Sequence, residues 1–425
     1  MVFNHPIIPD WYAGLVSRIA QQEFVKGTTK VMDEVSRMIS YWQEILRPLP
    51  SLVANMTVDV VVVGSGYTGL WTAELLSRRG LTVCILESEQ PGWGASGRNG
   101  GLVIPGLAVL YPDVVKTVGA AIAETLYRRT VEAQALVREV AQGSTTSVDY
   151  AETGSLYLAA DPKEWAQLQE TKRLLDKIGI AAELIQHAQL PHSLKKPERP
   201  GGLFMEADGR VHPLKLIQWL IDRIIARGSF IFGNSRVLRI DESTSGVLVT
   251  TSRASVAADH VIIATNARAS SLYPPFADHI FPIRGQMLVT TPVAALDYAY
   301  PVYADWGYKY WHQRADGRLL IGGWRDLDIP GERGHTLQLN PTIQRALERF
   351  AEALVGKPVA IERRWAGTMA FTRDRLPWVG PVGLRTIIAA GFNGHGSTNT
   401  VMAAQLMAEV LLDGKNWIPA LLPRP

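Results

Sequence analysis

The sequence predicts an α/β fold in which a domain with a mostly parallel sheet is interleaved with a second, mixed-sheet α+β domain. The chain has 425 residues, more than the roughly 250–300 at which one hydrophobic core stops growing. A β-branched run at 57–63 is followed by a glycine-rich turn, a helical pattern and a second apolar strand, which together make one βαβ unit. Strand and helix patterns then follow in mixed order, as expected when each domain is assembled from separate stretches of chain.

Composition excludes several classes of protein. With 43 basic and 40 acidic residues the formal net charge is +3, and the clustered basic face of a nucleic-acid-binding protein is missing. Cys84 is the only cysteine, so we expect no internal disulfide and no cysteine-based zinc site, and a buried, unreactive thiol. We also expect no bound metal. No stretch reaches the roughly 18 apolar residues of a membrane helix, and residues 1–10 lack a signal-peptide pattern. We expect a cytoplasmic protein without a transmembrane segment.

Residues 1–56 are expected to form a helical N-terminal extension. Helical periodicity covers 10–46, and an apolar stripe at helical spacing runs from Val35 to Leu46. The stripe must be covered either by the rest of the chain or by a protein partner, and the sequence leaves both open. Pro48 ends the helix.

The βαβ unit opens the first domain. The run at 57–63 reads as a buried parallel strand, and the helix after it extends through Arg79, with Gly80 as its C-terminal cap. The second strand covers 82–86.

The remaining elements divide between the two domains. Helices are predicted over 113–141, 162–178, 214–225, 341–354 and 397–412. Strands are predicted over 155–160, 237–249, 260–264, 282–291, 319–323 and 386–390. We expect the first domain to comprise 57–110, 200–275 and 360–425, and the second to comprise 111–199 and 276–359.

The sharpest motif is Gly64-Ser65-Gly66-Tyr67-Thr68-Gly69, which follows a predicted strand and opens a predicted helix. The first glycine permits the tight turn, the second lets the backbone approach a pyrophosphate, and the third lets the helix pack on the sheet. Glu87 ends the next strand, where a carboxylate accepts hydrogen bonds from a ribose and repels a 2′-phosphate. The motif therefore predicts a dinucleotide site and disfavours NADP.

Two further glycine-rich segments extend this prediction. The first, Gly92–Gly101, suits backbone lying flat against a large ring, although a flexible surface loop is the alternative. The second, Gly391–Ser397, precedes a helix whose positive N-terminus would stabilise the negative edge of a reduced flavin. Two helix starts far apart in sequence favour FAD over NAD.

In these segments the sequence resembles the D-amino-acid oxidase and glycine oxidase family, the DAO-type FAD-dependent oxidoreductases, and most resembles its γ-glutamylputrescine oxidase-like members. The resemblance runs from about residue 57 to the end and is carried by 60–69, 94–101, 209–213, 260–266, 282–286, 374–377 and 391–396. It implies a Rossmann-like FAD-binding domain interleaved with a mixed-sheet α+β substrate domain, the glutathione-reductase-type or DAO fold.

The resemblance also implies which residues bind FAD. The expected set is Gly64, Ser65, Gly66, Tyr67, Thr68, Gly69, Glu87, Ser88, Gly94, Ala95, Ser96, Arg98, Asn99, Gly100, Gly101, Val237, Thr265, Asn266, Gly391, Gly394, His395, Gly396, Ser397 and Thr398. Some relatives attach FAD to a cysteine near the C-terminal glycine turn, and others to a histidine near the glycine-rich loop. Neither residue stands there, so non-covalent FAD is expected.

The expected activity is oxidation of a carbon–nitrogen bond in a small amine or amino acid to an imine, which water then hydrolyses. His395, Arg284, Tyr310 and Trp311 are the candidate catalytic residues, because aromatic walls suit an amine and arginine suits a carboxylate. The sequence leaves open that the aromatic residues pack between the two domains and that Arg284 anchors its strand. An oxidase is expected rather than a dehydrogenase, although sarcosine-oxidase relatives carry a lysine in the strand at 319–323 that is missing here. The alternatives are a flavoprotein acting on a side chain of a partner protein, an acceptor other than oxygen, and a non-catalytic FAD-binding module.

Overall fold

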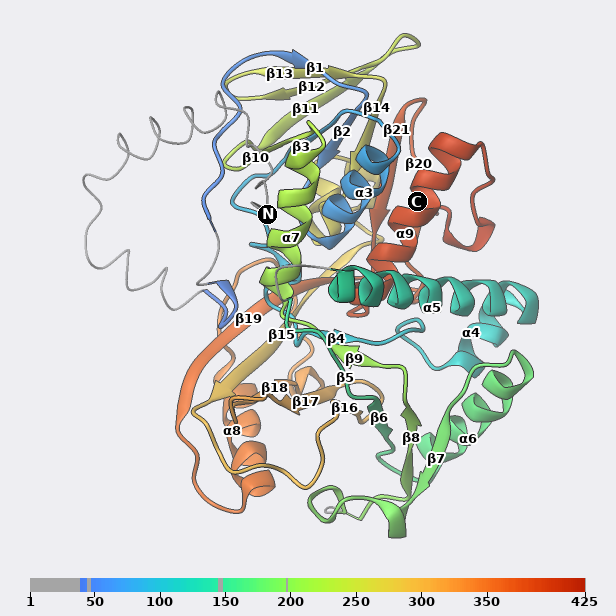
Figure 1. Cartoon of the computed structure of the whole chain (residues 1–425), viewed down its shortest axis with the longest axis vertical. Helices are drawn as coiled ribbons and strands as arrows, with labels where there is room; N and C mark the ends of the chain where they lie inside the picture. The colour runs from blue at the N-terminus through green and yellow to red at the C-terminus, as the bar shows by residue number, and fades with distance from the viewer. Residues whose placement is uncertain (1–38, 44–46, 144–147, 196–197, 425) are drawn as a thin grey trace, which may run out of the picture.

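The computed structural model of this chain describes residues 39–43, 47–143, 148–195 and 198–424 (Figure 1). The expected helix over 10–46 and most of its apolar stripe therefore lie outside the described residues. Among those that are described, no helix has both the length and the apolar character needed to cross a membrane.

A six-stranded sheet forms the centre of the upper half of the molecule in Figure 1. In spatial order its strands are β10 (Phe230–Phe232), β3 (Val83–Leu86), β2 (Val60–Val63), β14 (His260–Ile263), β21 (Thr386–Ala390) and β20 (Trp378–Pro381). All neighbours are parallel except β20, which runs antiparallel to β21. The four valines of β2 are all buried, as expected for a parallel strand covered on both faces.

The single strand predicted over 57–63 is divided in two. β1 (Met56–Thr57) pairs with another sheet, and β2 starts only at Val60. The break falls at Asp59, whose carboxylate accepts a hydrogen bond from the Thr82 N–H at 2.6 Å. The charged residue marks the point where the chain crosses from one sheet to the next.

Three helices pack together on the six-stranded sheet, and their apolar faces form much of the largest core. They are α3 (Tyr67–Arg78), α7 (Pro213–Ala226) and α9 (Gly396–Asp413). Helix α3 contacts both of the others (Figure 1). The first and last glycine motifs of the sequence are thus brought to neighbouring helix starts.

An eight-stranded mixed sheet forms the lower half of the molecule (Figure 1). Its strands, in spatial order, are β19 (Ile361–Phe371), β15 (Phe281–Thr290), β18 (Leu319–Gly323), β17 (Lys309–Gln313), β16 (Val302–Ala304), β6 (Ser155–Leu158), β8 (Gly201–Met205) and β7 (Glu183–Gln186). Helix α8 (Pro341–Val355) packs on β15 and β18. Only β16 and β6 run parallel.

The helical pattern predicted over 113–141 is two helices. They are α4 (Tyr111–Val118) and α5 (Ala120–Gly143), and Gly119 between them has φ +82°. A left-handed residue ends a helix, so the periodicity continues through a break that periodicity alone does not reveal. Helix α6 (Pro162–Lys177) starts at Asp161, whose carboxylate accepts from the Glu164 N–H.

Two smaller sheets complete the fold. The first contains β1, β13 (Ser255–Ala258), β12 (Val247–Thr251) and β11 (Val237–Glu242), and the second contains β4 (Leu102–Val103), β9 (Gly209–Arg210) and β5 (Ala151–Glu152). The strand predicted over 237–249 is therefore the hairpin of β11 and β12.

The expected domain boundaries stay a prediction, but sheet membership bears on two of them. Residues 200–205 and 360–371 were expected in the FAD-binding domain, yet β8 and β19 pair within the eight-stranded sheet. Strand β15 holds β19 along ten residue pairs, from Phe281 opposite Phe371 to Thr290 opposite Ile361.

Candidate active site

A cavity of about 560 Å³ lies where the carboxyl ends of the parallel strands meet the eight-stranded sheet. One wall follows β2, β3, β14 and β21 and contains Gly64, Glu87, Thr265 and Gly394. The opposite wall contains Tyr310 and other residues of β15, β17 and β19. Ligands of open α/β sheets bind at this edge.

The start of α3 forms the first end of the cavity. Gly64 has φ +103°, a conformation that residues with a Cβ rarely adopt. A Cβ on Gly69 would lie 2.0 Å from the Gly64 carbonyl oxygen, so the helix can approach the turn only with glycine there. No acidic residue stands in the first turn of α3, which leaves its positive end available for an anion.

Glu87 is tied to the same turn. One carboxylate oxygen accepts from the Ser65 N–H and hydroxyl at 2.8 and 2.9 Å, and the other accepts from the Ser88 hydroxyl and the Glu89 N–H at 3.2 and 3.0 Å. A carboxylate has about four acceptor positions, so a ribose hydroxyl would share or replace one of these. The Ser88 hydroxyl, at the longest distance, is the one most easily replaced.

The glycine-rich loop 92–101 lines the middle of the cavity. Ser96 accepts a hydrogen bond from the Tyr67 N–H at 2.8 Å, which joins the loop to the first turn of α3. Arg98 is buried and donates to the carbonyls of Trp93 and Ala366 at 2.8 and 3.2 Å. Burial lowers the pKa of Arg98 to about 10, so the side chain stays charged and braces the loop.

The start of α9 forms the far end. His395 is the N-cap residue of this helix and is buried. Burial, helped by the nearby Arg325 cation, lowers the pKa of His395 to about 4. The imidazole is therefore neutral at physiological pH.

Three buried polar atoms in the cavity wall lack a hydrogen-bond partner among the described residues: Thr265 Oγ1, Thr368 Oγ1 and His395 Nδ1. Buried polar groups are almost always satisfied, so these atoms point to a polar ligand. Together with two helix N-termini and a glycine cradle between them, they fit a long ligand with phosphates at one end and a polar ring at the other. The donor set suits FAD.

A second cavity of about 300 Å³ adjoins the first. Tyr303, Gly307, Arg325, Asn393 and His395 line both cavities. The smaller cavity is also lined by aliphatic residues of 105–110 and by five further aromatic side chains, those of Tyr111, Tyr127, Tyr157, Trp306 and Tyr308. Tyr303 meets the His395 ring edge-on at 5.4 Å, so the shared wall is tightly packed.

Charged groups stand at several points around the smaller cavity. The Arg325 guanidinium lies over the rings of Tyr308 and Phe371, at 4.5 and 5.3 Å from their centroids, and forms no ion pair with any described residue. Glu164 and Asp208 also line this cavity. Burial raises the pKa of each carboxyl to about 7, although the Arg138 cation acts on Asp208 in the opposite direction, and neither carboxyl forms an ion pair within the described ranges.

Most of the residues expected to bind FAD line the larger cavity. These are Gly64, Gly66, Tyr67, Thr68, Glu87, Ser88, Gly94, Ala95, Ser96, Arg98, Asn99, Gly100, Val237, Thr265, Asn266, Gly394, His395, Gly396 and Ser397. Ser65, Gly69, Gly101, Gly391 and Thr398 are not among its lining residues. They support the wall from behind, as the Thr398 hydroxyl does by donating to the Ile104 carbonyl at 2.7 Å.

The four candidate catalytic residues separate into two pairs. His395 and Tyr310 line the larger cavity. Arg284 is buried beside Glu332 and donates to the carbonyls of Gly331 and Thr336.

Trp311 lies in the core beneath α8, where its indole N–H donates to the Tyr298 hydroxyl at 2.6 Å. Neither Arg284 nor Trp311 lines either cavity, which argues against a catalytic role for both. In a strand, neighbouring side chains point to opposite faces, so Tyr310 and Trp311 cannot share one wall.

Sequence reasoning missed Arg325, Glu164 and Asp208. Arg325 stands two residues after the predicted strand at 319–323, directly after Trp324, which has φ +58°. That turn carries the arginine into the cavity wall, and no motif marks it. Glu164 is an isolated acidic residue in a predicted helix, and Asp208 is an isolated acidic residue in a turn, so neither belongs to a motif.

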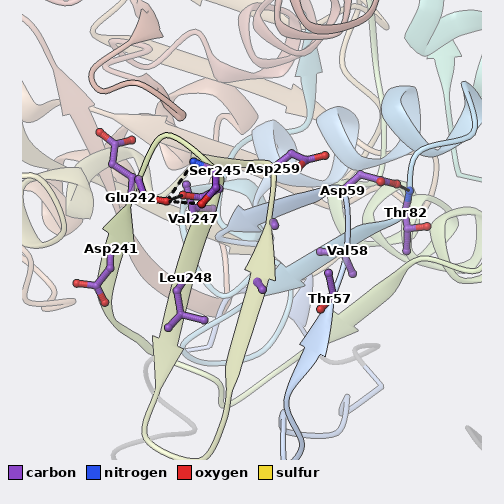
Figure 2. A pocket seen from close by; sticks show the side chains of 14 residues that line it. Thr57, Val58, Asp59, Thr82, Asp241, Glu242, Ser245, Val247, Leu248 and Asp259 are labelled. Atoms are coloured by element: carbon purple, nitrogen blue, oxygen red, sulfur yellow. Dashed lines mark hydrogen bonds between the residues drawn. The ribbon is translucent and has the colours of Figure 1, made fainter.

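A third hollow, of about 670 Å³, lies away from this site beside the four-stranded sheet. Figure 2 shows Asp59, Asp241, Glu242 and Asp259 around it. Glu242 accepts from the Leu384 and Arg385 N–H groups at 3.0 Å each. Its carboxylate thus connects the hairpin to the chain before β21, which is a structural role.

The pH dependence of stability tests whether His312, which packs against the loop 92–101, is buried as a neutral imidazole. It is buried and its Nε2 lies 2.9 Å from the Gly100 carbonyl oxygen. Burial, with a smaller contribution from Arg210, lowers its pKa from 6.5 to about 3. As pH falls below 6.5 the unfolded chain binds a proton that the folded chain does not, so stability is lost toward pH 3, by up to about 1.4 kcal/mol per pH unit.

Urea unfolding between pH 7 and pH 4 should therefore show a shallower pH slope for His312→Gln than for wild type. Glutamine keeps a donor for the Gly100 carbonyl but does not titrate. Identical slopes for the two proteins would contradict the neutral, buried imidazole.

Comparison with known proteins agrees with this geometry. The family model described as DAO, FAD dependent oxidoreductase, matches residues 59–410. The chain is 31% identical over 374 residues to gamma-glutamylputrescine oxidoreductase of Escherichia coli (strain K12), covering 86% of each protein.

Solved structures show the same fold. Glycine oxidase from Geobacillus kaustophilus superposes with a TM-score of 0.70 at 22% identity, covering 85% of this chain and 96% of the other. L-proline dehydrogenase from P. horikoshii superposes with a TM-score of 0.70 at 23% identity, covering 87% and 96%. With a family match over most of its length and a cavity whose walls suit the cofactor, this chain belongs to the DAO family of FAD-dependent oxidoreductases.

Proposed function

We propose that this protein oxidises a carbon–nitrogen bond of a small amine or amino acid to an imine, which water then hydrolyses. The observation that carries the proposal is the wall shared by the two cavities, formed by Tyr303, Arg325 and His395 among others. A substrate in the smaller cavity would lie directly against the ligand of the larger one. FAD, when bound, accepts the hydrogen and the electron pair that leave the substrate.

The side chains of the shared wall suit a neutral amine. His395 is uncharged, so its free ring nitrogen can accept a hydrogen bond from an amine N–H. Burial keeps the Tyr303 and Tyr310 hydroxyls protonated by raising their pKa values, so both remain donors. Burial and the Arg325 cation also disfavour an ammonium group at this wall, which leaves the amine in the form that can be oxidised.

The first substrate candidate is a γ-glutamyl amine, the substrate class in the name of the E. coli relative. Its far end carries a carboxylate and an ammonium group. Arg375 lines the smaller cavity but not the shared wall and could hold the carboxylate, while Glu164 and Asp208 could hold the ammonium group. A simple α-amino acid is the second candidate, with Arg325 on its carboxylate.

An anaerobic screen tests the proposal directly. The holoenzyme is mixed without oxygen with γ-glutamylputrescine, putrescine, glycine, proline and butylamine, and bleaching of the oxidised flavin band is followed. We expect rapid bleaching by at least one γ-glutamyl amine or amino acid. A flavin that no amine reduces would favour a non-catalytic role for FAD.

Admitting air after reduction tests the electron acceptor. We propose oxygen, so the flavin band should return within seconds and hydrogen peroxide should form. Slow return with fast reoxidation by an artificial quinone would instead identify a dehydrogenase. No lysine lines either cavity in the described residues. Arg325, which lines both cavities, is the positive charge that we propose for the reaction with oxygen.

Action on a partner protein remains the second candidate function, because the N-terminal extension precedes the matched family region. Deleting residues 1–38 and repeating the screen separates the cases, since retained turnover of free amines favours the small-molecule enzyme. The deletion must stop before Ser40, whose hydroxyl donates to the cavity loop.

A further inference from the structure

The short segment Ser40–Gln43 reaches across to the glycine-rich loop that lines the larger cavity. The Ser40 hydroxyl donates to the Gly97 carbonyl at 2.5 Å, and the Trp42 indole N–H donates to the Asn99 carbonyl at 2.7 Å. The Gln43 amide donates to the carbonyls of Gly92 and Trp93 at 3.1 and 3.2 Å. Three side chains thus bind four carbonyls of one loop.

Residues 40–43 are packed into the body of the protein. Ser40, Trp42 and Gln43 are all buried, with 0%, 1% and 8% of their surface exposed. The Trp42 ring meets His212 edge-on at 4.7 Å, and the Arg314 guanidinium lies 5.2 Å from its centroid. Aromatic packing of this kind fixes the direction in which the indole N–H points.

The body of the protein holds the remaining carbonyls on this stretch of the loop. Trp365 Nε1 donates to the Arg98 carbonyl at 2.9 Å, His312 Nε2 lies 2.9 Å from the Gly100 carbonyl oxygen, and the Val211 N–H donates to the Gly101 carbonyl at 2.8 Å. Trp365, His312 and Val211, which supply these donors, do not line the cavity. A carbonyl that accepts from a donor outside the cavity has its negative end directed away from a cofactor inside it.

None of residues 40–43 lines the cavity, whereas Gly92, Trp93 and Asn99, whose carbonyls they bind, do. Ser40, Trp42 and Gln43 are thus placed to act on the cofactor only through the loop. Without their donors the loop would populate other conformations, and FAD would bind only the fraction that remains competent.

We propose that Ser40–Gln43 is a clasp that holds the FAD-binding loop in its binding conformation, with Trp42 as the principal positioning residue. The clasp precedes residue 59, where the match to the family model begins. Affinity for FAD in this protein is therefore set in part by a segment that the matched family region does not include.

The test measures FAD binding rather than turnover. Apoprotein of Trp42→Phe, Ser40→Ala and the double variant is titrated with FAD, and quenching of flavin fluorescence gives the dissociation constant. Trp42→Phe keeps the buried ring but removes the donor, so the dissociation constant should rise about tenfold, and about a hundredfold in the double variant. The visible circular dichroism of bound FAD at saturation should also change, because the loop lies against the cofactor.

Thr290→Val is the matched control. It removes another buried side-chain donor to a backbone carbonyl, from Thr290 Oγ1 to Thr291 at 2.7 Å, and neither Thr290 nor its strand partner Ile361 lines a cavity. FAD affinity should stay at the wild-type value in this variant. Wild-type affinity in Trp42→Phe and in Ser40→Ala, or an equal loss in Thr290→Val, would overturn the clasp. If the double variant fails to fold, the two single variants decide.

Discussion

Gly69→Ala is expected to yield a protein that purifies without its yellow colour. The added Cβ would lie 2.0 Å from the Gly64 carbonyl oxygen and 3.1 Å from its carbonyl carbon, and both are backbone atoms that cannot rotate aside. The first turn of α3 must therefore move away from the turn at Gly64–Gly66, and its N–H groups move with it. Overpacking of this kind costs about 1–3 kcal/mol, so the FAD dissociation constant should rise by up to about a hundredfold.

Gly143→Ala provides the control, because a Cβ there meets no atom within 4 Å. It should bind FAD as wild type does. Circular dichroism of the two apoproteins establishes that both are folded before the titration. A folded Gly69→Ala protein with wild-type FAD affinity would mean that the start of α3 does not hold the pyrophosphate.

Most of the residues predicted to bind FAD line one cavity, whereas only two of the four predicted catalytic residues line a cavity, and the difference has a physical reason. Phosphate binding needs free N–H groups at a helix start and glycines that allow close approach, and these requirements fix residue types over a few consecutive positions. The motifs at Gly64–Gly69 and Gly391–Ser397 could therefore be recognised from a few consecutive residues. The parallel sheet follows from the same local pattern, since β2 and β3 each consist of four buried apolar residues.

The smaller cavity is assembled from single residues of different elements, and no local pattern marks them. Arg284 was expected at the site because arginine suits a carboxylate, yet its guanidinium lies within hydrogen-bonding distance of the carbonyls at Gly331 and Thr336. Arg325, and not Arg284, lines both cavities. Which of two arginines faces a cavity depends on strand register and on the turn at Trp324, and both are tertiary properties.

The segment Ser40–Gln43 shows the same limit of prediction from sequence. Trp42 was read as one member of an apolar helical stripe, and its burial agrees with that. Its hydrogen bond joins residues 57 positions apart, and nothing in the local sequence indicates that pairing. The sequence can predict that a side chain is buried, but it does not predict which group that side chain will hydrogen-bond to.

Arg325→Leu should produce the largest loss of turnover on substrates that carry a carboxylate. Its guanidinium is held over Tyr308 and Phe371 without an ion-pair partner among the described residues, so a bound carboxylate would be its counter-ion. Removing one partner of a buried charge pair costs about 2–5 kcal/mol. We expect kcat/KM for an α-amino acid, whose carboxylate is next to the reacting amine, to fall by about a hundredfold or more. Arg325→Lys keeps the charge but loses the planar fork, and about a tenfold loss is expected.

Two comparisons make this result specific to the carboxylate. Butylamine carries no acid group, so Arg325→Leu should change the rate at which it reduces the flavin much less than it changes the rate with an acidic substrate. Arg373→Leu removes an exposed arginine that lines neither cavity, and it should leave both rates near wild type. Equal losses on butylamine and on the acidic substrate would instead place Arg325 in the chemistry of the flavin wall. In that case the anionic end of the substrate would have to lie at Arg375, the other arginine that lines the smaller cavity.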